Sequence, residues 1–506
     1  MSKPIRQHNA PVLIVGAGSS GLSTALQLQR AGVDFVIIDA AETPCAESRA
    51  GGMQPRTLEL LDLHEVSDEL IAGGGRRVKA FTNFLDGVEV GRIEFPPSGE
   101  SRFHNPPTMR QADIEATLRR RLASNGTEVQ MRHRLVSIEQ NEKDIVARIE
   151  TPDGSIDFTT DWLIGTDGAR STVRKITGLE FEGMSYPETM GLMDAELEWD
   201  MPPDELRVYR LAGSTQQFVI VPFRDKTYRI QITDRPDELV NTPPTVEEMQ
   251  ELFDRFTGLN GVISNPIWTS AFNVHRRQAA TYRSGRALLA GDAAHIHTPA
   301  GAQGLNTGIQ DGINLGWKLA MVVKGEADAS FIDTYEEERR PIAKDVLELA
   351  DNMTNRPMSL LGPGGKTPPA LTKRLAQLAV TYRDGPMGQP ARIDDLPTAG
   401  DRLPDIEVDG GSIYRKLRPG NLVIALFGDI TDPAQSGEEF AAFLADIDIW
   451  RCSADHPLAQ ALGIGQGAVV IRPDAYLGRI IEAPVPQAVA DVADWLRSVL
   501  TLKTAA

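Results

Sequence analysis

Residues 12–21 read Val12-Leu13-Ile14-Val15-Gly16-Ala17-Gly18-Ser19-Ser20-Gly21, an apolar run followed by a GxGxxG motif. Four consecutive apolar residues are typical of a strand buried on both faces in a parallel sheet. Gly16 permits a tight turn, Gly18 lets the backbone approach a pyrophosphate, and Gly21 allows a helix to pack closely on the strand. The pattern predicts a Rossmann-like unit whose helix N-terminus faces phosphate groups.

The residues that follow complete this unit. An apolar helical pattern continues to Gly32, and a second apolar run, Phe35-Val36-Ile37-Ile38, ends at Asp39, 18 residues after Gly21. A carboxylate at the end of the second strand can accept hydrogen bonds from a ribose. The motif does not separate FAD from NAD, and a Gly-rich turn in an unrelated α/β fold is the alternative.

Size and composition limit the class of protein. A chain of 506 residues is expected to form two or three domains. Its net charge of −18 argues against nucleic acid as a partner. Two distant cysteines, Cys45 and Cys452, argue against disulfides and a metal site. No signal peptide or membrane-length apolar run is visible, so a cytoplasmic enzyme is expected.

Further patterns predict three domains. Residues 1–180 and 283–355 are expected to form a discontinuous nucleotide-binding domain, including helices over 111–124 and 304–323. Residues 181–282 look like an inserted antiparallel-sheet domain, with strands at 218–223 and 228–233. Residues 356–400, rich in Pro and Gly, are expected to be a linker. Residues 401–506 form a smaller α/β unit, with strands at 422–427 and 468–472 and helices at 438–444 and 485–500.

A second conspicuous block begins at Gly291-Asp292-Ala293-Ala294-His295, after a short apolar strand. It continues through Pro299-Ala300-Gly301-Ala302-Gln303-Gly304-Leu305-Asn306 into a helix. Asp292 can bind a sugar-alcohol hydroxyl, and the helix N-terminus can stabilise negative charge on a reduced flavin. The alternative is a tight connector, with Gly308, Gly312 and Gly316 serving only close helix packing.

Four blocks together resemble the single-component flavoprotein aromatic hydroxylases, the group of p-hydroxybenzoate hydroxylase and phenol hydroxylase. They are the GxGxxG unit, Ser48-Arg49-Ala50 with residues 55–61, residues 165–171 (Gly-Thr-Asp-Gly-Ala-Arg-Ser), and the block from Gly291 to Gly308. Their order and spacing match over about residues 10–345. One departure is Ala302, where the family often has Gly.

The resemblance implies roles for individual residues. FAD is the expected cofactor, with NADPH or NADH docking transiently because no second nucleotide-binding unit is present. Asp167 would serve FAD and, indirectly, the nicotinamide. The other residues implied in FAD binding are Gly16, Gly18, Gly21 and Asp39 for the ADP half, Arg49 near the pyrophosphate, Gln111 and Asp292 along the flavin chain, and Pro299, Gly301, Gly304, Leu305 and Asn306 beside the isoalloxazine.

The resemblance implies hydroxylation of a phenolic aromatic substrate with dioxygen, through a flavin C4a-hydroperoxide. The alternatives are a reductase of the same fold and a flavin-containing binding protein without turnover. No catalytic base is assigned. His295 and His297 favour a structural role, as do the weaker candidates His104, Arg277 and Tyr282.

The inserted sheet is a candidate for the roof of the substrate pocket, through Gln217, Phe218, Val219 and Phe223. Alternation places Gln217 and Phe218 on opposite faces, without showing which face meets the flavin. The C-terminal unit resembles a thioredoxin-like domain, and the sequence Arg472-Pro473-Asp474 near its last strand agrees with this resemblance. It lacks a CxxC pair, so stabilisation or a homodimer contact is expected rather than thiol chemistry.

Overall fold

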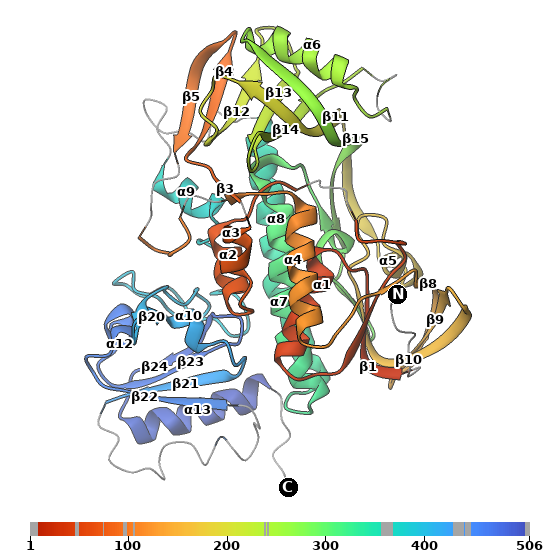
Figure 1. Cartoon of the computed structure of the whole chain (residues 1–506). Helices are drawn as coiled ribbons and strands as arrows, with labels where there is room; N and C mark the ends of the chain where they lie inside the picture. The colour runs from red at the N-terminus through yellow and green to blue at the C-terminus, as the bar shows by residue number, and fades with distance from the viewer. Residues whose placement is uncertain are drawn as a thin grey trace.

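The computed structural model describes residues 9–500 apart from 46–49, 74, 95–98, 105–106, 237–238, 240–241, 356–367, 429–439 and 441–446. Its first sheet has the order β16-β17-β10-β1-β2-β7, and β9 pairs with β10 and with β8 beyond it (Figure 1). The strands are β1 (Asn9–Val15), β2 (Phe35–Asp39), β7 (Gln130–Met131), β8 (Arg134–Gln140), β9 (Ile145–Thr151), β10 (Gly154–Gly165), β16 (Arg283–Ser284) and β17 (Ala287–Leu289). The strands β2, β1, β10 and β17 are parallel, which confirms the predicted nucleotide-binding architecture.

Helices cover this sheet. They include α1 (Ser19–Arg30), α4 (Gln111–Ser124) and α7 (Gly304–Val323), in agreement with the sequence prediction. The others are α2 (Pro55–Asp62), α3 (Ser67–Ala72), α5 (Thr172–Ile176) and α8 (Asp333–Asn355). Because α1 and α7 lie side by side, the two ends of the discontinuous domain meet along one helix pair (Figure 1).

Glycines allow the close approach of α1 and α7. A Cβ built on Gly312 would lie 2.5 Å from Ser23 Oγ, and one on Gly316 would lie 2.8 Å from Gln27 Cβ. No real Cβ tolerates such distances, so these positions require glycine. Gly312 and Gly316 therefore have the helix-packing role that the sequence allowed as an alternative to a cofactor role.

The second sheet has the order β18-β15-β11-β14-β13-β12-β4-β5. Its strands are β4 (Ala80–Leu85), β5 (Val88–Glu94), β11 (Phe181–Trp199), β12 (Glu205–Arg210), β13 (Gln217–Pro222), β14 (Thr227–Thr233), β15 (Gly261–Ala279) and β18 (His295–Ile296). Helix α6 (Val246–Thr257) covers its outer face (Figure 1). There Phe218 packs against Phe253 and Phe256.

Two expectations for this sheet were wrong. Strands β4 and β5 belong to it although the predicted boundary placed them in the first domain, and β4 runs parallel to β12, so the sheet is mixed. The chain enters this sheet, returns to the first domain at α4, and enters again at β11. A boundary drawn from a change of sequence character does not detect such a non-local pairing.

The C-terminal unit is a four-stranded sheet with short helices. Strands β22 (Ile447–Cys452), β21 (Leu422–Phe427), β23 (Gly467–Ile471) and β24 (Leu477–Ile481) lie in this order. The unit also contains β19 (Glu407–Val408), β20 (Gly411–Ser412), α10 (Ile413–Lys416), α12 (Pro457–Leu462) and α13 (Val485–Val499). The predicted strands and closing helix are confirmed, whereas the helix predicted at 438–444 lies, except for residue 440, outside the described residues.

The predicted linker is partly folded. Its first residues, 356–367, lie outside the described part of the chain, but α9 (Pro369–Leu375) follows them. Leu371, Leu375 and Tyr382 are buried. The segment from residue 368 onward therefore packs into the protein and does not form a free connector.

Buried ion pairs join the C-terminal unit to the first domain. Glu338 on α8 accepts hydrogen bonds from Lys318 Nζ on α7, at 2.8 Å, and from both terminal nitrogens of Arg472. Asp474 also pairs with Arg472. Burial alone would raise the pKa of Glu338, but the charges of Arg472 and Lys318 lower this pKa to about 2. The Arg472-Pro473-Asp474 sequence thus fixes the C-terminal unit to α7 and α8.

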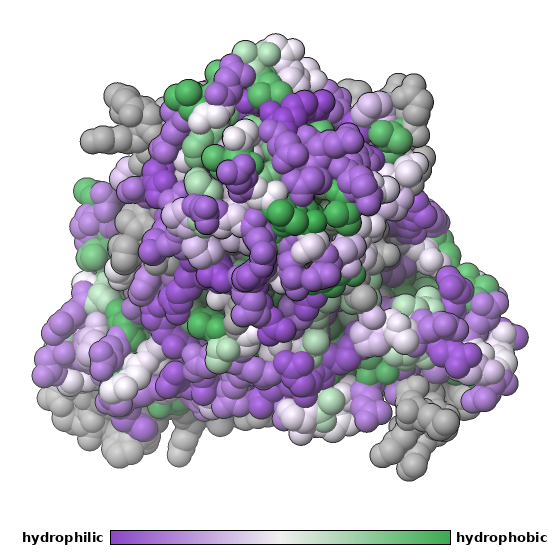
Figure 2. Space-filling view, turned by 45° about the horizontal axis from the view of Figure 1, so that its top comes forward, coloured by the Kyte–Doolittle hydropathy of each residue, from purple (hydrophilic) through white to green (hydrophobic). Residues whose placement is uncertain are grey.

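The surface visible from one side is mostly polar, with apolar side chains in small separate groups (Figure 2). No helix among the described residues is long and apolar enough to cross a membrane.

Candidate cofactor and substrate site

The turn between β1 and α1 requires glycine at two positions. Gly16 has φ 103°, and a Cβ there would lie 2.5 Å from the carbonyl oxygen of Thr166. A Cβ on Gly21 would lie 2.0 Å from the carbonyl oxygen of Gly16. Gly18 differs, because its Cβ would approach only Glu115 Oε1, at 3.7 Å. Packing therefore explains Gly16 and Gly21, whereas Gly18 keeps open the approach to the α1 N-terminus.

Acidic and amide side chains surround this N-terminus. Asp39 Oδ2 accepts a hydrogen bond from Ala17 N and Oδ1 accepts one from Ala41 N, both at 2.8 Å. Glu115 Oε1 accepts from the backbone and hydroxyl of Ser19. Gln111 Nε2 donates to the same oxygen at 2.8 Å. Burial raises the pKa of Glu115, a residue of this site that no sequence motif marked.

The second block folds against the same end of α1. Gly291, with φ 61°, lies so close that a Cβ would approach Ser20 Oγ to 2.1 Å. A Cβ on Gly308 would lie 2.4 Å from the same oxygen. Asp292 follows Gly291 at the surface of this junction and is exposed. Segments nearly three hundred residues apart therefore meet at Ser20.

The loop before α7 has two left-handed residues. Gly301 has φ 75° and Ala302 has φ 53°. A non-glycine residue in this region is strained by roughly 1–2 kcal/mol, which gives a reason for the glycine that the family often has at position 302. Asn306 holds the loop: its Nδ2 donates to the carbonyls of Gly52 and Ala302, and its Oδ1 accepts from Gln54 N at 2.8 Å.

A buried group of amide side chains supports the loop from behind. Gln303 Nε2 donates to the Gly301 carbonyl at 2.7 Å, and Gln377 Nε2 donates to Gln303 Oε1 at 2.9 Å. Gln377 belongs to the segment 356–400, which was predicted to be a linker. No local motif marks it, because its contacts depend on the fold.

The two histidines of this block have structural contacts. His295 Nε2 lies 2.6 Å from Asp311 Oδ2, and Asp311 Oδ1 accepts from Arg339 Nε at 2.7 Å. His297 Nδ1 lies 2.6 Å from the Thr298 carbonyl, so Nδ1 carries the proton. Burial lowers the pKa of His297 to about 4, and its Nε2 is buried without a hydrogen-bond partner near Gly304. His297 is therefore a neutral acceptor beside the α7 N-terminus.

Asp167 acts as a helix cap. Its Oδ2 accepts from Thr172 N at 2.6 Å and Val173 N at 3.1 Å, at the start of α5. Arg174 on α5 donates to the carbonyls of Ala293 and Ala169. The Asp-Gly motif is thereby held against the Gly291–Ala293 turn, which lies beside the α1 N-terminus.

The inner face of the second sheet adjoins this loop. A Cβ on Gly52 would lie 3.4 Å from Ala302 Cβ, and one on Gly51 would lie 3.4 Å from Phe223 and from Arg229 Nη1. Arg229 forms a buried bidentate pair with Asp194. Burial raises the pKa of Asp194, although the charge and hydrogen bonds of Arg229 act in the opposite direction. Phe218 packs under α6, so the other face of β13 carries Gln217 and Val219 toward the first domain.

The remaining sequence candidates lie elsewhere or have ordinary partners. The Tyr282 hydroxyl accepts a hydrogen bond from Gln278 inside the core, where burial raises its pKa. Arg277 Nη2 donates to Ser185 Oγ, and the His104 carbonyl accepts from Arg77. Arg49 lies outside the described residues. In the part of the chain that the structure describes, no cluster of three potential metal ligands is found.

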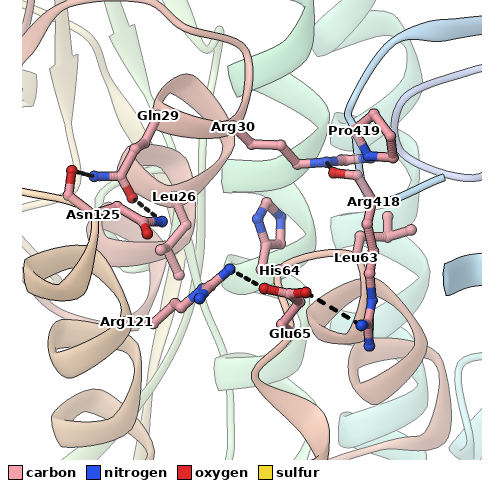
Figure 3. A pocket seen from close by; sticks show the side chains of 10 residues that line it. All are labelled: Leu26, Gln29, Arg30, Leu63, His64, Glu65, Arg121, Asn125, Arg418 and Pro419. Atoms are coloured by element: carbon pink, nitrogen blue, oxygen red, sulfur yellow. Dashed lines mark hydrogen bonds and ion pairs between the residues drawn. The ribbon is translucent and has the colours of Figure 1, made fainter. Parts of the chain in front are cut away.

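A separate pocket lies at the other end of α1. Figure 3 shows Gln29 bonded to Asn125 on one side and Glu65 between Arg121 and Arg418 on the other. Leu26 and Arg30, near the C-terminal end of α1, also line it. None of its lining residues belongs to the predicted cofactor set, so it is not the site described above.

Known proteins share this architecture. The family described as FAD binding domain matches residues 9–350. The chain is 31% identical to a rifampicin monooxygenase of Rhodococcus hoagii, over 93% of this chain and 95% of that protein. It is 30% identical to pentachlorophenol 4-monooxygenase of Sphingobium chlorophenolicum, over 84% and 81%. A solved anhydrotetracycline hydroxylase of Streptomyces rimosus superposes with a TM-score of 0.80 at 28% identity, covering 98% of this chain and 100% of that one.

The fold and the paired glycine loops define an FAD-binding α/β protein. With the family matched over most of its length, the chain belongs to the FAD-binding-domain family of flavoprotein monooxygenases. It is an FAD-dependent aromatic monooxygenase, and NAD(P)H is the usual reductant in this family.

Proposed function

We propose that the loops gathered at Ser20 form one continuous FAD site in this hydroxylase. The observation that carries the proposal is the junction of Ser20 with Gly291 and Gly308, which leaves no room for a Cβ. The junction supports the proposal, because the start of α1 lies against Gly291, which precedes Asp292, and against Gly308 in the first turns of α7. The open approach at Gly18 fits a pyrophosphate, because helix N-termini present free N–H groups.

Each residue in this site has a role that its surroundings allow. Asp39 keeps lone pairs for the ADP ribose, since each of its carboxylate oxygens accepts one hydrogen bond from a backbone N–H. Asp292 would accept from the ribityl chain. Pro299, Gly301, Gly304 and Leu305 would flank the flavin ring by backbone atoms, while Asn306 holds the loop to Gly52 and Gln54. Gln111 would contact the flavin chain beside Glu115.

His297 would support the loop beside the flavin as a neutral side chain. Its Nε2 is covered by the protein next to Gly304 and has no hydrogen-bond partner among the described residues, and the ring is neutral because its pKa is about 4. Asp167, which caps α5, would act on the cofactors by holding the Asp-Gly loop in place.

Bound FAD would supply the redox chemistry with dioxygen, and the chain would supply orientation and exclusion of water. The inner face of the second sheet would cover a phenolic substrate next to Gly51. Hydroxylation needs an electron-rich ring, so the substrate would react as its phenolate. We further propose that the C-terminal unit is thioredoxin-like and stabilises α7 and α8 through Arg472.

The test measures three quantities on the FAD-loaded protein with a panel of phenols: NADPH or NADH oxidation, oxygen uptake and hydroxylated product. The expected result is a substrate for which the three rates agree. A reductase would oxidise the nicotinamide without oxygen appearing in a product. Reduction that no aromatic compound accelerates, with no product, would contradict the proposal.

A further inference from the structure

The inner face of the second sheet is arranged in three rows across its strands. The first row, Asp194, Arg229 and Val221, adjoins Gly51. The second row contains Leu192, Gln231, Val219, Val208 and Asn83, and the third contains Met190, Thr233, Gln217 and Arg210. Successive rows are two positions apart along each strand, so the third lies about 13 Å from the first in the strand direction.

This face is less covered than the outer face. On the outer face Phe218, Ile220, Ile230 and Ile232 are completely buried by α6. On the inner face Val219, Gln231, Gln217 and Arg210 remain half-buried in the middle strands. Part of the inner face therefore stays accessible in the middle strands.

Arg210 has no acidic partner among the described residues. Its Nη2 donates to Asn83 Oδ1 at 3.3 Å, and its Nε is buried without a hydrogen-bond partner. Burial lowers its pKa, with no compensating charge. By contrast, Arg229 on β14 and Arg235 just after that strand each pair with a carboxylate. A half-buried guanidinium without a counter-ion is a binding group for an anionic oxygen.

Gln217 and Gln231 add polar groups beside it. No hydrogen bond from either side chain to another described residue is present. The bond from Arg210 to Asn83 turns its guanidinium back toward the second row. Near Gly51, the inner face consists of Phe223 and the paired side chains of Asp194 and Arg229. Farther from Gly51 the inner face is polar, and there Arg210 carries a positive charge that no described carboxylate neutralises.

We propose that Arg210 binds an acidic oxygen on the remote part of a substrate with several fused aromatic rings. The inference rests on the proposed function, because it takes the reacting ring to lie beside Gly51. A single phenol placed there would not reach from the first row to the guanidinium. The substrate class is therefore a polycyclic aromatic compound with a carboxylate, phenolate or enolate at the end opposite the hydroxylated ring.

The test measures binding to the oxidised, FAD-loaded protein, by the change in flavin absorbance and fluorescence. The probes are anthraquinone-2-carboxylate, anthraquinone-2-carboxamide and 4-hydroxybenzoate. We expect the carboxylate to bind more tightly than the carboxamide by roughly 10- to 100-fold, the range for a hydrogen bond to a charged group. Arg210→Met should abolish that difference and leave carboxamide binding unchanged, and Arg210→Lys should retain part of it.

Arg92→Met is the matched control. Arg92 lies on β5 and pairs with Glu205 beside Thr82, on the opposite face of the sheet, so its loss should change none of the three affinities. Equal affinities for carboxylate and carboxamide in the unmodified protein would overturn the proposal. So would failure of both anthraquinones to bind, or an equal loss for both in Arg210→Met.

These outcomes are separable from the proposed function, because no probe measurement needs turnover. Charge-selective binding in a protein that hydroxylates nothing would refute the hydroxylase proposal alone. Coupled hydroxylation of phenols with charge-independent binding would refute the role of Arg210 alone.

Discussion

Replacing Gly18 by serine should separate cofactor binding from folding. Gly18 is the N-cap of α1, with φ −75° and ψ −175°, which serine adopts without strain. A Cβ there would meet only Glu115 Oε1, at 3.7 Å, and serine is a preferred N-cap residue. The free energy of unfolding of the apoprotein should therefore stay the same or rise by a few tenths of a kcal/mol.

The same side chain would occupy the approach of the pyrophosphate. An anion at a helix N-terminus gains up to about 2 kcal/mol, and hydrogen bonds to charged groups contribute about 1.5–3 kcal/mol. Partial loss of these interactions corresponds to a roughly 10- to 100-fold weaker affinity for FAD. The affinity is measured by titrating apoprotein with FAD and following the quenching of flavin fluorescence.

Gly312→Ala is the control with the opposite expectation. Its Cβ would lie 2.5 Å from Ser23 Oγ and 2.7 Å from the Ser20 carbonyl oxygen, so α1 and α7 must separate. Overpacking of this kind costs about 1–3 kcal/mol of apoprotein stability, measured by chemical denaturation. If Gly18→Ser bound FAD as tightly as the unmodified protein, the pyrophosphate would not lie at α1, and the proposed site would be refuted.

Three further changes test the surroundings of the site. Glu338→Gln leaves Lys318 and Arg472 buried without their shared carboxylate and should lower the unfolding free energy by about 3–5 kcal/mol; a loss below about 1 kcal/mol in thermal and chemical denaturation would contradict the role of this pair. Burial lowers the pKa of His297 from 6.5 to about 4. Between these pH values the imidazole is protonated in the unfolded chain but neutral in the folded protein, so the free energy of unfolding falls as the pH falls. Relative to the unmodified protein, His297→Gln should therefore gain about 3 kcal/mol on going from about pH 7 to about pH 4, and a difference independent of pH would show that His297 is not buried as described. Ala302→Gly removes a left-handed alanine with φ 53° and should raise the melting temperature slightly, with a stability gain of up to about 1 kcal/mol; a clear decrease would show that the alanine is not strained.

Local patterns predicted the nucleotide-binding unit well. The apolar strand, the glycine turn and the first helix depend on residues adjacent in sequence, and each has the predicted place. The helices at 111–124 and 304–323 follow from regular apolar spacing in the same way. The packing role of Gly312 and Gly316, by contrast, stayed open, because the partner helix is far away in the chain.

Other features required the fold itself. Alternation showed that Gln217 and Phe218 lie on opposite faces, but only the position of α6 decided that Phe218 is covered and Gln217 is not. The membership of β4 in the second sheet, and the support of Gln303 by Gln377, also depend on contacts between distant segments.

The sequence by itself determined the turn at Gly16, the strand that precedes it and the helix that follows, since steric limits on neighbouring backbone units act over a few residues. The tertiary structure alone decided which carboxylate faces which arginine and left Arg210 without one. Charge pairing and burial depend on distances through space, and those distances arise only when separate segments pack together.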